Sequence, residues 1–318
     1  MRVAITGGTG FIGANLVRRV LADGHEVHLF LRRSHDPWRI RDLGDRVRTL
    51  LVDLTDADDV AGALRTARPD WVFHLAAYGA YPSQSDPEQA VRTNVLATIR
   101  LLEASRAAGA AAFVSAGSSS EYGFKDHAPS EDERPEPNSL YAVTKAAASD
   151  YLAWVSRRDG ARAVTLRLYS AYGPWEEPTR FVPQLVLAGL DGRLPPLVDS
   201  RVARDFVYVD DVCEAFVRAA TARDVPAGAV YNIGTATQTS IGEAVAIARE
   251  LMGITMEPAW GSMPERSWDT SVWVADARRS ASELGWTAKT SFRDGLARTI
   301  DWFRGVKVRA VYAERLGR

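Results

Sequence analysis

Thr6-Gly7-Gly8-Thr9-Gly10-Phe11-Ile12-Gly13 follows directly on the apolar run at residues 2–5. Gly7, Gly10 and Gly13 are spaced three residues apart. Glycine lacks a Cβ atom, so its backbone can turn tightly and approach a ligand closely. The N-terminus of a helix that follows such a turn favours a negatively charged group such as a pyrophosphate. The segment therefore predicts a strand, a phosphate-binding turn and a helix.

Strand-like and helical patterns alternate beyond this turn. The strand-like runs are residues 2–5, 26–31, 47–52, 71–76, 112–115 and 164–168, and the helical stretches are 11–22, 57–67, 87–108 and 139–158. The strand-like runs are almost continuously hydrophobic, which is typical of a parallel sheet covered by helices on both faces. The alternation predicts an α/β protein with a doubly wound parallel sheet of the Rossmann type.

After about residue 174, prolines and short mixed elements replace the alternation. We therefore expect residues 1–174 to form the core of a dinucleotide-binding domain. Residues 175–318 are expected to form mainly a smaller mixed lobe, with some segments returning to the first domain.

The composition indicates which partners, cross-links and metals are expected. The net charge of −1 gives no support for a nucleic-acid partner. Cys213 is the one cysteine, so an internal disulfide is impossible and a packing role is expected. The sequence shows no run of about 18 apolar residues and no signal-like start, so a cytoplasmic protein without a membrane partner is expected. The five histidines show no metal-ligand spacing, and no metal is expected.

The second strand-like run indicates which dinucleotide binds. It ends at Leu31, and Arg32 and Arg33 follow. NAD sites often carry an acidic side chain here for the ribose hydroxyls, whereas guanidinium groups match a 2′-phosphate. The sequence thus favours NADP(H) over NAD(H), with a solvated basic turn as the alternative. Asp53, after the third run, is expected to contact the adenine unless it is a simple turn residue.

Tyr141 and Lys145 are four residues apart and would share one face of a helix. A tyrosine with a pKa near 10 is a poor acid or base at neutral pH. A neighbouring ammonium group stabilises the phenolate, which predicts a lowered pKa for Tyr141. Ser118, just past the fifth strand-like run, would orient the reacting oxygen toward Tyr141, although turn chemistry also explains a serine-rich loop. These three residues are the predicted catalytic set.

Together these motifs resemble the extended short-chain dehydrogenase/reductases, in particular the nucleotide-sugar epimerase/dehydratase/reductase group. The resemblance covers nearly the whole chain. It is carried by TGGTGFIG (6–13), HLAA (74–77), Asn94, SSSEYG (118–123), YAVTK (141–145), RLYSAYGP (167–174), RDFVYVDDV (204–212) and RSWD (266–269) with Asp276 after it.

The resemblance implies that Tyr141 is the general acid/base, that Lys145 is its electrostatic partner and that Ser118 orients the reacting oxygen. The expected cofactor-binding residues are Gly7, Gly10, Phe11, Ile12, Gly13, Arg32, Arg33, Asp53, Leu54, Ala76, Ala77, Tyr141, Lys145 and Tyr169. The expected residues for a nucleotide-diphosphate sugar are Tyr78, Ser119, Ser120, Ser170, Arg180, Arg204 and Arg266. Arg204 and Arg266 would hold the diphosphate. At Ser170 this chain departs from the family, where asparagine is common. A homodimer through the helices that contain Asn94 and Tyr141 is also implied.

The residues just before Tyr122 help to distinguish the reactions that the enzymes of this group catalyse. Sugar 4,6-dehydratases and decarboxylases resemble one another in a glutamate two residues before the loop tyrosine, often with aspartate before it. Here Ser119 and Ser120 stand at those positions, and Glu121 comes one residue later and should project differently. The dehydratase reading is therefore disfavoured.

Reductases and epimerases remain, because both need only hydride transfer at C4 and a proton relay through Tyr141. A reductase consumes NADPH, whereas an epimerase retains its cofactor and typically uses NAD. Arg32 and Arg33 favour an NADP(H)-dependent reductase. The loop GSSSEYG (117–123) resembles the loops of 4-keto-6-deoxyhexose reductases, which implies a nucleotide-linked 4-keto-6-deoxyhexose as the substrate. An NAD-dependent nucleotide-sugar 4-epimerase is the alternative, and a non-catalytic NADP-binding regulator is the least favoured.

Overall fold

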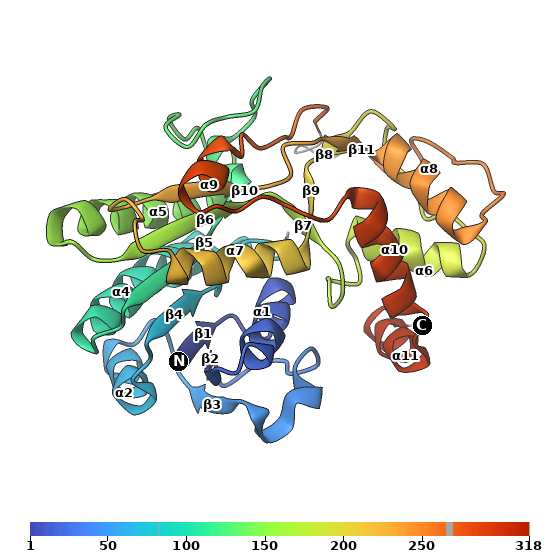
Figure 1. Cartoon of the computed structure of the whole chain (residues 1–318). Helices are drawn as coiled ribbons and strands as arrows, with labels where there is room; N and C mark the ends of the chain where they lie inside the picture. The colour runs from blue at the N-terminus through green and yellow to red at the C-terminus, as the bar shows by residue number, and fades with distance from the viewer. Residues whose placement is uncertain (82, 265–269, 318) are drawn as a thin grey trace.

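The computed structural model describes residues 1–81, 83–264 and 270–317, which form two lobes (Figure 1). Among these residues, seven strands form one parallel sheet in the order β10-β6-β5-β4-β1-β2-β3. The strands are β1 (Arg2–Thr6), β2 (Glu26–Leu31), β3 (Arg48–Leu51), β4 (Trp71–His74), β5 (Ala112–Ser118), β6 (Ala163–Leu168) and β10 (Val230–Ile233). The sheet confirms the predicted doubly wound α/β fold.

Helices cover both faces of this sheet (Figure 1). One face packs against α1 (Phe11–Ala22) and α7 (Val209–Thr221). The other face packs against α2 (Ala57–Ala67), α4 (Ala97–Ala107) and α5 (Leu140–Asp159). Val3 and Ile5 of β1 belong to the first core and Ala4 to the second. Because both faces are buried, the strands are hydrophobic without alternation.

The strand order reverses at β1, whose two neighbours in the sheet are β2 and β4. In doubly wound sheets a crevice forms at this point, outside the carboxyl ends of the strands, and ligands bind there. The glycine-rich turn follows β1, and the HLAA segment begins at the end of β4. The topology therefore brings the two predicted cofactor segments together.

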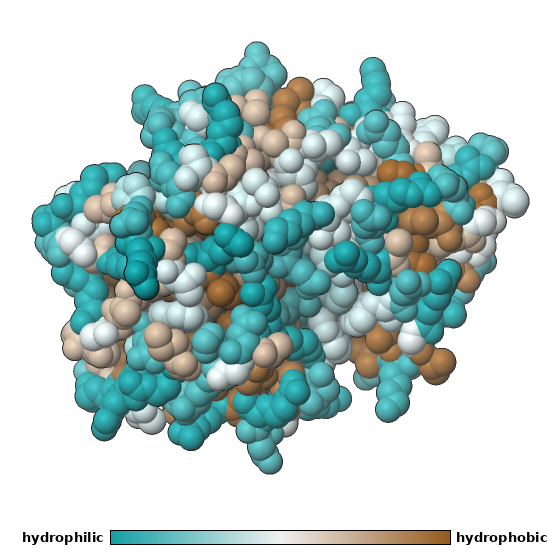
Figure 2. All heavy atoms as spheres, viewed as in Figure 1, coloured by the Kyte–Doolittle hydropathy of each residue, from teal (hydrophilic) through white to brown (hydrophobic). Residues whose placement is uncertain are grey.

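The smaller lobe has its own apolar core. It is built from α6 (Phe181–Leu190), α8 (Ile241–Met252), α10 (Phe292–Phe303), α11 (Val306–Arg315) and β9 (Phe206–Tyr208). β9 pairs with β7 (Ser170–Tyr172), and β8 (Ala203–Arg204) pairs with β11 (Thr239–Ser240). Figure 2 shows hydrophobic side chains reaching the surface of this lobe, where Met256, Trp260 and Val306 are exposed.

Two segments of the second half of the chain pack against the larger lobe. α7 packs against α1, and β10 extends the sheet beside β6. Asp205, in the smaller lobe, fixes the chain as it leaves β10, because its buried carboxylate accepts hydrogen bonds from Thr235, Ala236 and Ala275. Cys213 of α7 is buried in the core of the larger lobe, which confirms its predicted packing role.

No helix within residues 1–81, 83–264 and 270–317 combines the length and hydrophobicity that a membrane span requires. The short elements that complete the description are η1 (Arg41–Arg46), α3 (Pro87–Ala90), η2 (Val91–Leu96), η3 (Ser119–Tyr122) and α9 (Arg278–Glu283).

Candidate active site

The glycine-rich turn between β1 and α1 is tightly packed. Gly7 has a positive φ of 70°, and a Cβ there would lie 2.6 Å from the Ala76 nitrogen. A Cβ on Gly13 would lie 2.1 Å from the Gly7 carbonyl oxygen. Gly10 is the N-cap of α1, and it supplies no side-chain acceptor for the first amides of the helix. This turn and helix N-terminus fit the pyrophosphate of a nicotinamide dinucleotide.

A buried hydrogen-bond chain links the two sides of the crevice. The Thr98 hydroxyl donates its only proton to the Asn94 carbonyl at 2.7 Å. Its oxygen is therefore the acceptor in the 2.9 Å hydrogen bond with His74, and Nε2–H of His74 is the donor. Nδ1 of His74 then accepts from the Thr6 hydroxyl at 2.7 Å. Burial, followed by the charge of Lys145, lowers the pKa of His74 to about 3, so its imidazole is neutral at physiological pH. The chain ties β1, β4 and α4 together beneath the crevice.

Asn94 secures the loop after β4. The sequence predicted one helix over residues 87–108, but the π-helical η2 interrupts it at Val91–Leu96. Within η2 the Asn94 side chain accepts from Tyr78 N–H at 2.8 Å and donates to the Tyr78 carbonyl and the Thr144 hydroxyl. These bonds connect the Tyr78 loop to α5. π-Helical turns frequently occur at functional sites.

The predicted catalytic residues meet at the ends of β5 and α5. Ser118 is the last residue of β5, and its oxygen accepts from Ser120 N–H at 3.2 Å. Tyr141 lies in the first turn of α5, and the Ser118 side chain acts to lower the pKa of its phenol. Since the Ser118 oxygen is already an acceptor, its proton is available for the phenol oxygen. Lys145, one turn further along α5, is 3 % exposed.

The pKa of Tyr141 is raised, whereas the sequence predicted that it would be lowered. Burial raises it to about 12, and the Ser118 side chain opposes that rise. The predicted lowering was wrong for the protein without bound cofactor, because it neglected the cost of placing a phenolate in the interior. Burial also lowers the pKa of Lys145, against the charge of Glu121.

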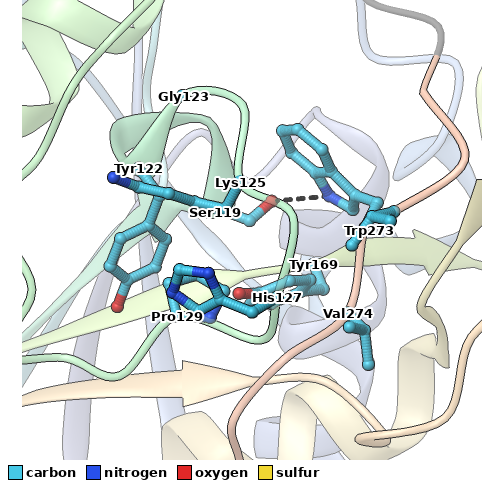
Figure 3. Close-up of a pocket in the computed structure, with 10 residues that line it drawn as sticks. Ser119, Tyr122, Gly123, Lys125, His127, Pro129, Tyr169, Trp273 and Val274 are labelled. Atoms are coloured by element: carbon cyan, nitrogen blue, oxygen red, sulfur yellow. Dashed lines mark hydrogen bonds between the residues drawn. The ribbon is translucent and has the colours of Figure 1, made fainter.

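The loop that follows Ser118 offers no carboxylate at positions 119 and 120. Glu121 projects differently, as predicted, since its oxygens accept from the Ser118 backbone N–H and from Arg167 Nε, both at 2.8 Å. The Ser119 hydroxyl accepts from the indole Nε1–H of Trp273 at 3.2 Å, and Figure 3 shows this contact beside a small cavity. Trp273 thus brings the second half of the chain against the catalytic loop.

The predicted cofactor residues lie along the crevice and beyond it. Leu54, Ala76 and Ala77 are at least partly accessible. Arg32 and Arg33 are exposed past the end of β2. The Asp53 carboxylate accepts from both the backbone N–H and the hydroxyl of Thr55, so it forms the turn that was the alternative expectation. Its contact with adenine stays a prediction.

Tyr169 was assigned to the cofactor, but it lines the small cavity with Ser119 and Trp273 (Figure 3). Its hydroxyl is buried and forms no hydrogen bond with the described part of the chain.

The predicted substrate residues come from both lobes. Arg204 donates to the carbonyls of Ala203 and Thr270, and its guanidinium lies 5.8 Å from the centre of the Trp273 ring. Ser170 is fixed through its backbone, which donates to the Asp205 carbonyl at 3.0 Å. Arg180 is the exposed N-cap of α6, and its charge acts on Tyr141. Arg266 lies outside the described residues.

Arg39 is a structural residue of the site that the sequence did not reveal. Its buried guanidinium donates to the carbonyls of Thr9 and Trp175 and to the Glu177 carboxylate. It therefore braces the glycine-rich turn against the segment after β7. No local pattern signals this role, because the three partners lie 30, 136 and 138 residues from Arg39 in the sequence. For Arg167 a signal existed, since a charge within a buried strand requires a partner.

The sequence and the structure of this chain were compared with those of known proteins. The model of the NAD dependent epimerase/dehydratase family matches residues 3–234. A UDP-glucose 4-epimerase of Mycolicibacterium smegmatis (strain ATCC 700084 / mc(2)155) is 33 % identical, over 96 % of this chain and 99 % of that protein. A dTDP-glucose 4,6-dehydratase of Streptomyces griseus is 32 % identical over 94 % and 93 %. The structure of MoeE5 with UDP-glucuronic acid and NAD is 37 % identical, covers 96 % and 99 %, and has a TM-score of 0.82. The chain therefore belongs to the NAD-dependent epimerase/dehydratase family of nucleotide-sugar enzymes.

Proposed function

We propose that the protein is a nucleotide-sugar 4-epimerase that retains NAD(H) and acts on a UDP-hexose. The observation that carries this proposal is the position of Ser118 at the end of β5, with Tyr141 and the buried Lys145 in the first turns of α5, next to a loop without a carboxylate at positions 119 and 120. Such a site can move a proton at the C4 oxygen. It lacks the acid that water loss across C5 and C6 would need.

Each residue has one task in this reaction. A bound nicotinamide ring supplies the hydride acceptor and donor. Tyr141 takes the proton of the C4 hydroxyl. It returns this proton after the sugar ring has turned its other face toward the nicotinamide. Ser118 orients the C4 oxygen toward the phenol, and the Lys145 charge stabilises the phenolate. Arg204 would hold the diphosphate.

Similar proteins support this choice over the reductase favoured from the sequence. The Mycolicibacterium smegmatis relative is described as a UDP-glucose 4-epimerase, and the MoeE5 structure holds UDP-glucuronic acid and NAD. The 4-keto-6-deoxyhexose reductase remains a second candidate. It is favoured by Arg32 and Arg33, which are exposed after β2, because guanidinium groups match a 2′-phosphate.

Product analysis distinguishes the two candidates. Purified protein is incubated with UDP-glucose or UDP-glucuronic acid, without added cofactor, and the sugar is followed by proton NMR. Inversion at C4 without net cofactor consumption is expected. Stoichiometric oxidation of added NADPH by a nucleotide 4-keto-6-deoxyhexose, with no inversion of either UDP-sugar, would replace the epimerase with the reductase.

The two arginines also give a binding prediction. Replacing Arg32 and Arg33 together with alanine should weaken NADP⁺ binding by about tenfold or more, because charge-assisted hydrogen bonds to a phosphate are lost. NAD⁺ affinity should change little. Calorimetric titration with both dinucleotides measures the effect, and Arg41→Ala, at another exposed arginine, is the control. Equal losses for both dinucleotides would show that the pair does not contact the 2′ position.

We further propose a homodimer through α4, α5 and η2. Leu96, Val143 and Trp154 expose 38 %, 49 % and 48 % of their surface on these helices. Val143→Glu should convert the dimer to a monomer, because the charge would be buried without a partner. Sedimentation velocity at micromolar concentration tests this. Val306→Glu, at an equally apolar but more exposed position of the other lobe, should leave the dimer intact. A monomeric native protein would disprove the arrangement.

A further inference from the structure

Glu121 is a fully buried carboxylate that the proposed reaction does not use. One oxygen accepts the Ser118 N–H and the other accepts Arg167 Nε, so both are occupied. The same side chain completes a capping box with Ser118 around η3. Gly117 leaves room for this carboxylate, because a Cβ at that position would lie only 2.9 Å from Oε1 of Glu121. The carboxylate is therefore built into the end of β5.

The charge of Glu121 acts on both titrating members of the catalytic set. It favours the ammonium form of Lys145 and so opposes the effect of burial on that pKa. It disfavours the phenolate of Tyr141 and so adds to the effect of burial on that pKa. Other charged or titratable groups face this cluster as well. They are Arg167 on β6, Asp150 on α5, Arg180 at the N-cap of α6 and His74 on β4, the last of which is neutral at physiological pH.

We propose that Glu121 is a positioning residue for Ser118, Tyr141 and Lys145. Its carboxylate holds the backbone N–H of Ser118 at the end of β5, and its charge favours the ammonium form of the buried Lys145. Arg167 holds the carboxylate in place. The kinetic consequence rests on the proposed function, whereas the effect on Lys145 exists without substrate.

A role as a simple counter-ion for Arg167 does not account for this geometry. Buried ion pairs contribute little net stability compared with apolar residues of similar volume. A counter-ion also has no need to accept the backbone N–H of the catalytic serine. Glu131 provides a comparison within the same protein. It is a buried carboxylate that accepts the Asn232 N–H at 2.8 Å and faces Arg279, but it is not among the groups that shift Tyr141 or Lys145.

Three variants separate the two roles. Glu121→Gln keeps an acceptor for the Ser118 N–H and removes the charge. Glu121→Gln leaves Arg167 buried without its carboxylate partner, and this variant could fold poorly. The double variant with Arg167→Gln removes that unpaired charge as well. Glu131→Gln is the matched control. The first readout is an NMR titration of lysine labelled at Cε, which is simple because the chain has four lysines: Lys125, Lys145, Lys289 and Lys307. Lys145→Arg assigns the signal.

The pKa of Lys145 should fall by about one unit in both Glu121 variants, because the charge of Glu121 acts on Lys145 and that of Arg167 does not. The pKa should stay unchanged in Glu131→Gln. Both limbs of the pH profile of kcat should then move to lower pH. Tyr141 loses its proton more readily without the neighbouring negative charge, and Lys145 also loses its proton more readily. At the native pH optimum kcat should fall about tenfold while KM stays nearly constant.

An unchanged pKa of Lys145 in the double variant, or an equal shift in Glu131→Gln, would overturn the proposal. A native pH profile in the double variant would overturn it as well, since Glu121 would then be a counter-ion. If the native protein converts no nucleotide sugar and the lysine signal still shifts, the proposed reaction fails and the positioning of Lys145 stands.

Discussion

Replacing Tyr141 with phenylalanine is expected to lower kcat by about 10²- to 10⁴-fold, the usual contribution of a positioned acid or base. The substitution removes the phenol hydroxyl and leaves the ring in place. Because the ring keeps its packing, the fold should be retained, and KM should change far less than kcat. Steady-state kinetics with a UDP-hexose, together with thermal unfolding, measure both quantities.

Tyr151→Phe is the matched control for this experiment. Tyr151 lies on the same helix, and its hydroxyl donates to Glu103 at 3.1 Å, away from the crevice. Its loss should leave kcat unchanged. If Tyr141→Phe retained most of the native activity, the proton at the C4 oxygen would have to move through another group, and the proposed chemistry would be wrong.

Gly13→Ala is expected to weaken dinucleotide binding by about 5- to 150-fold, the range that overpacking energies of about 1–3 kcal/mol give. The added methyl group would lie 2.1 Å from the Gly7 carbonyl oxygen and 3.0 Å from the Gly8 Cα. Both neighbours are backbone atoms, so the phosphate-binding turn itself must move away from α1. Titration calorimetry with NAD⁺ and NADP⁺ measures the loss.

Gly62→Ala controls for the effect of a methyl group on a helix. A Cβ at Gly62 in α2 finds its nearest neighbour at 3.8 Å, the end of the flexible Arg65 side chain. Dinucleotide affinity should be unchanged, and stability should rise slightly because alanine favours the helix. Native affinity in Gly13→Ala would mean that the pyrophosphate does not rest on this turn.

Much of the larger lobe follows from local patterns. The bounds of α1 and α2 coincide with the predicted ranges, since each helix begins where a turn or a cap allows it; Asp56 caps α2 through the amides of Asp58 and Asp59. The strands follow from continuous hydrophobic runs, which a two-sided sheet requires. Tyr141 and Lys145 share a helix face because their spacing matches the helical repeat.

Other features depend on segments that are distant in the sequence. Glu121 and Arg167 are 46 residues apart, and Arg39 reaches Trp175 over 136. The pKa of Tyr141 rises because tertiary packing removes water from the phenol, which the spacing of Tyr141 and Lys145 does not encode. Residue spacing thus sets the elements and the candidate groups, because those depend on neighbours along the chain. The charges, partners and protonation of those groups depend on desolvation and long-range contacts, which exist only in the folded protein.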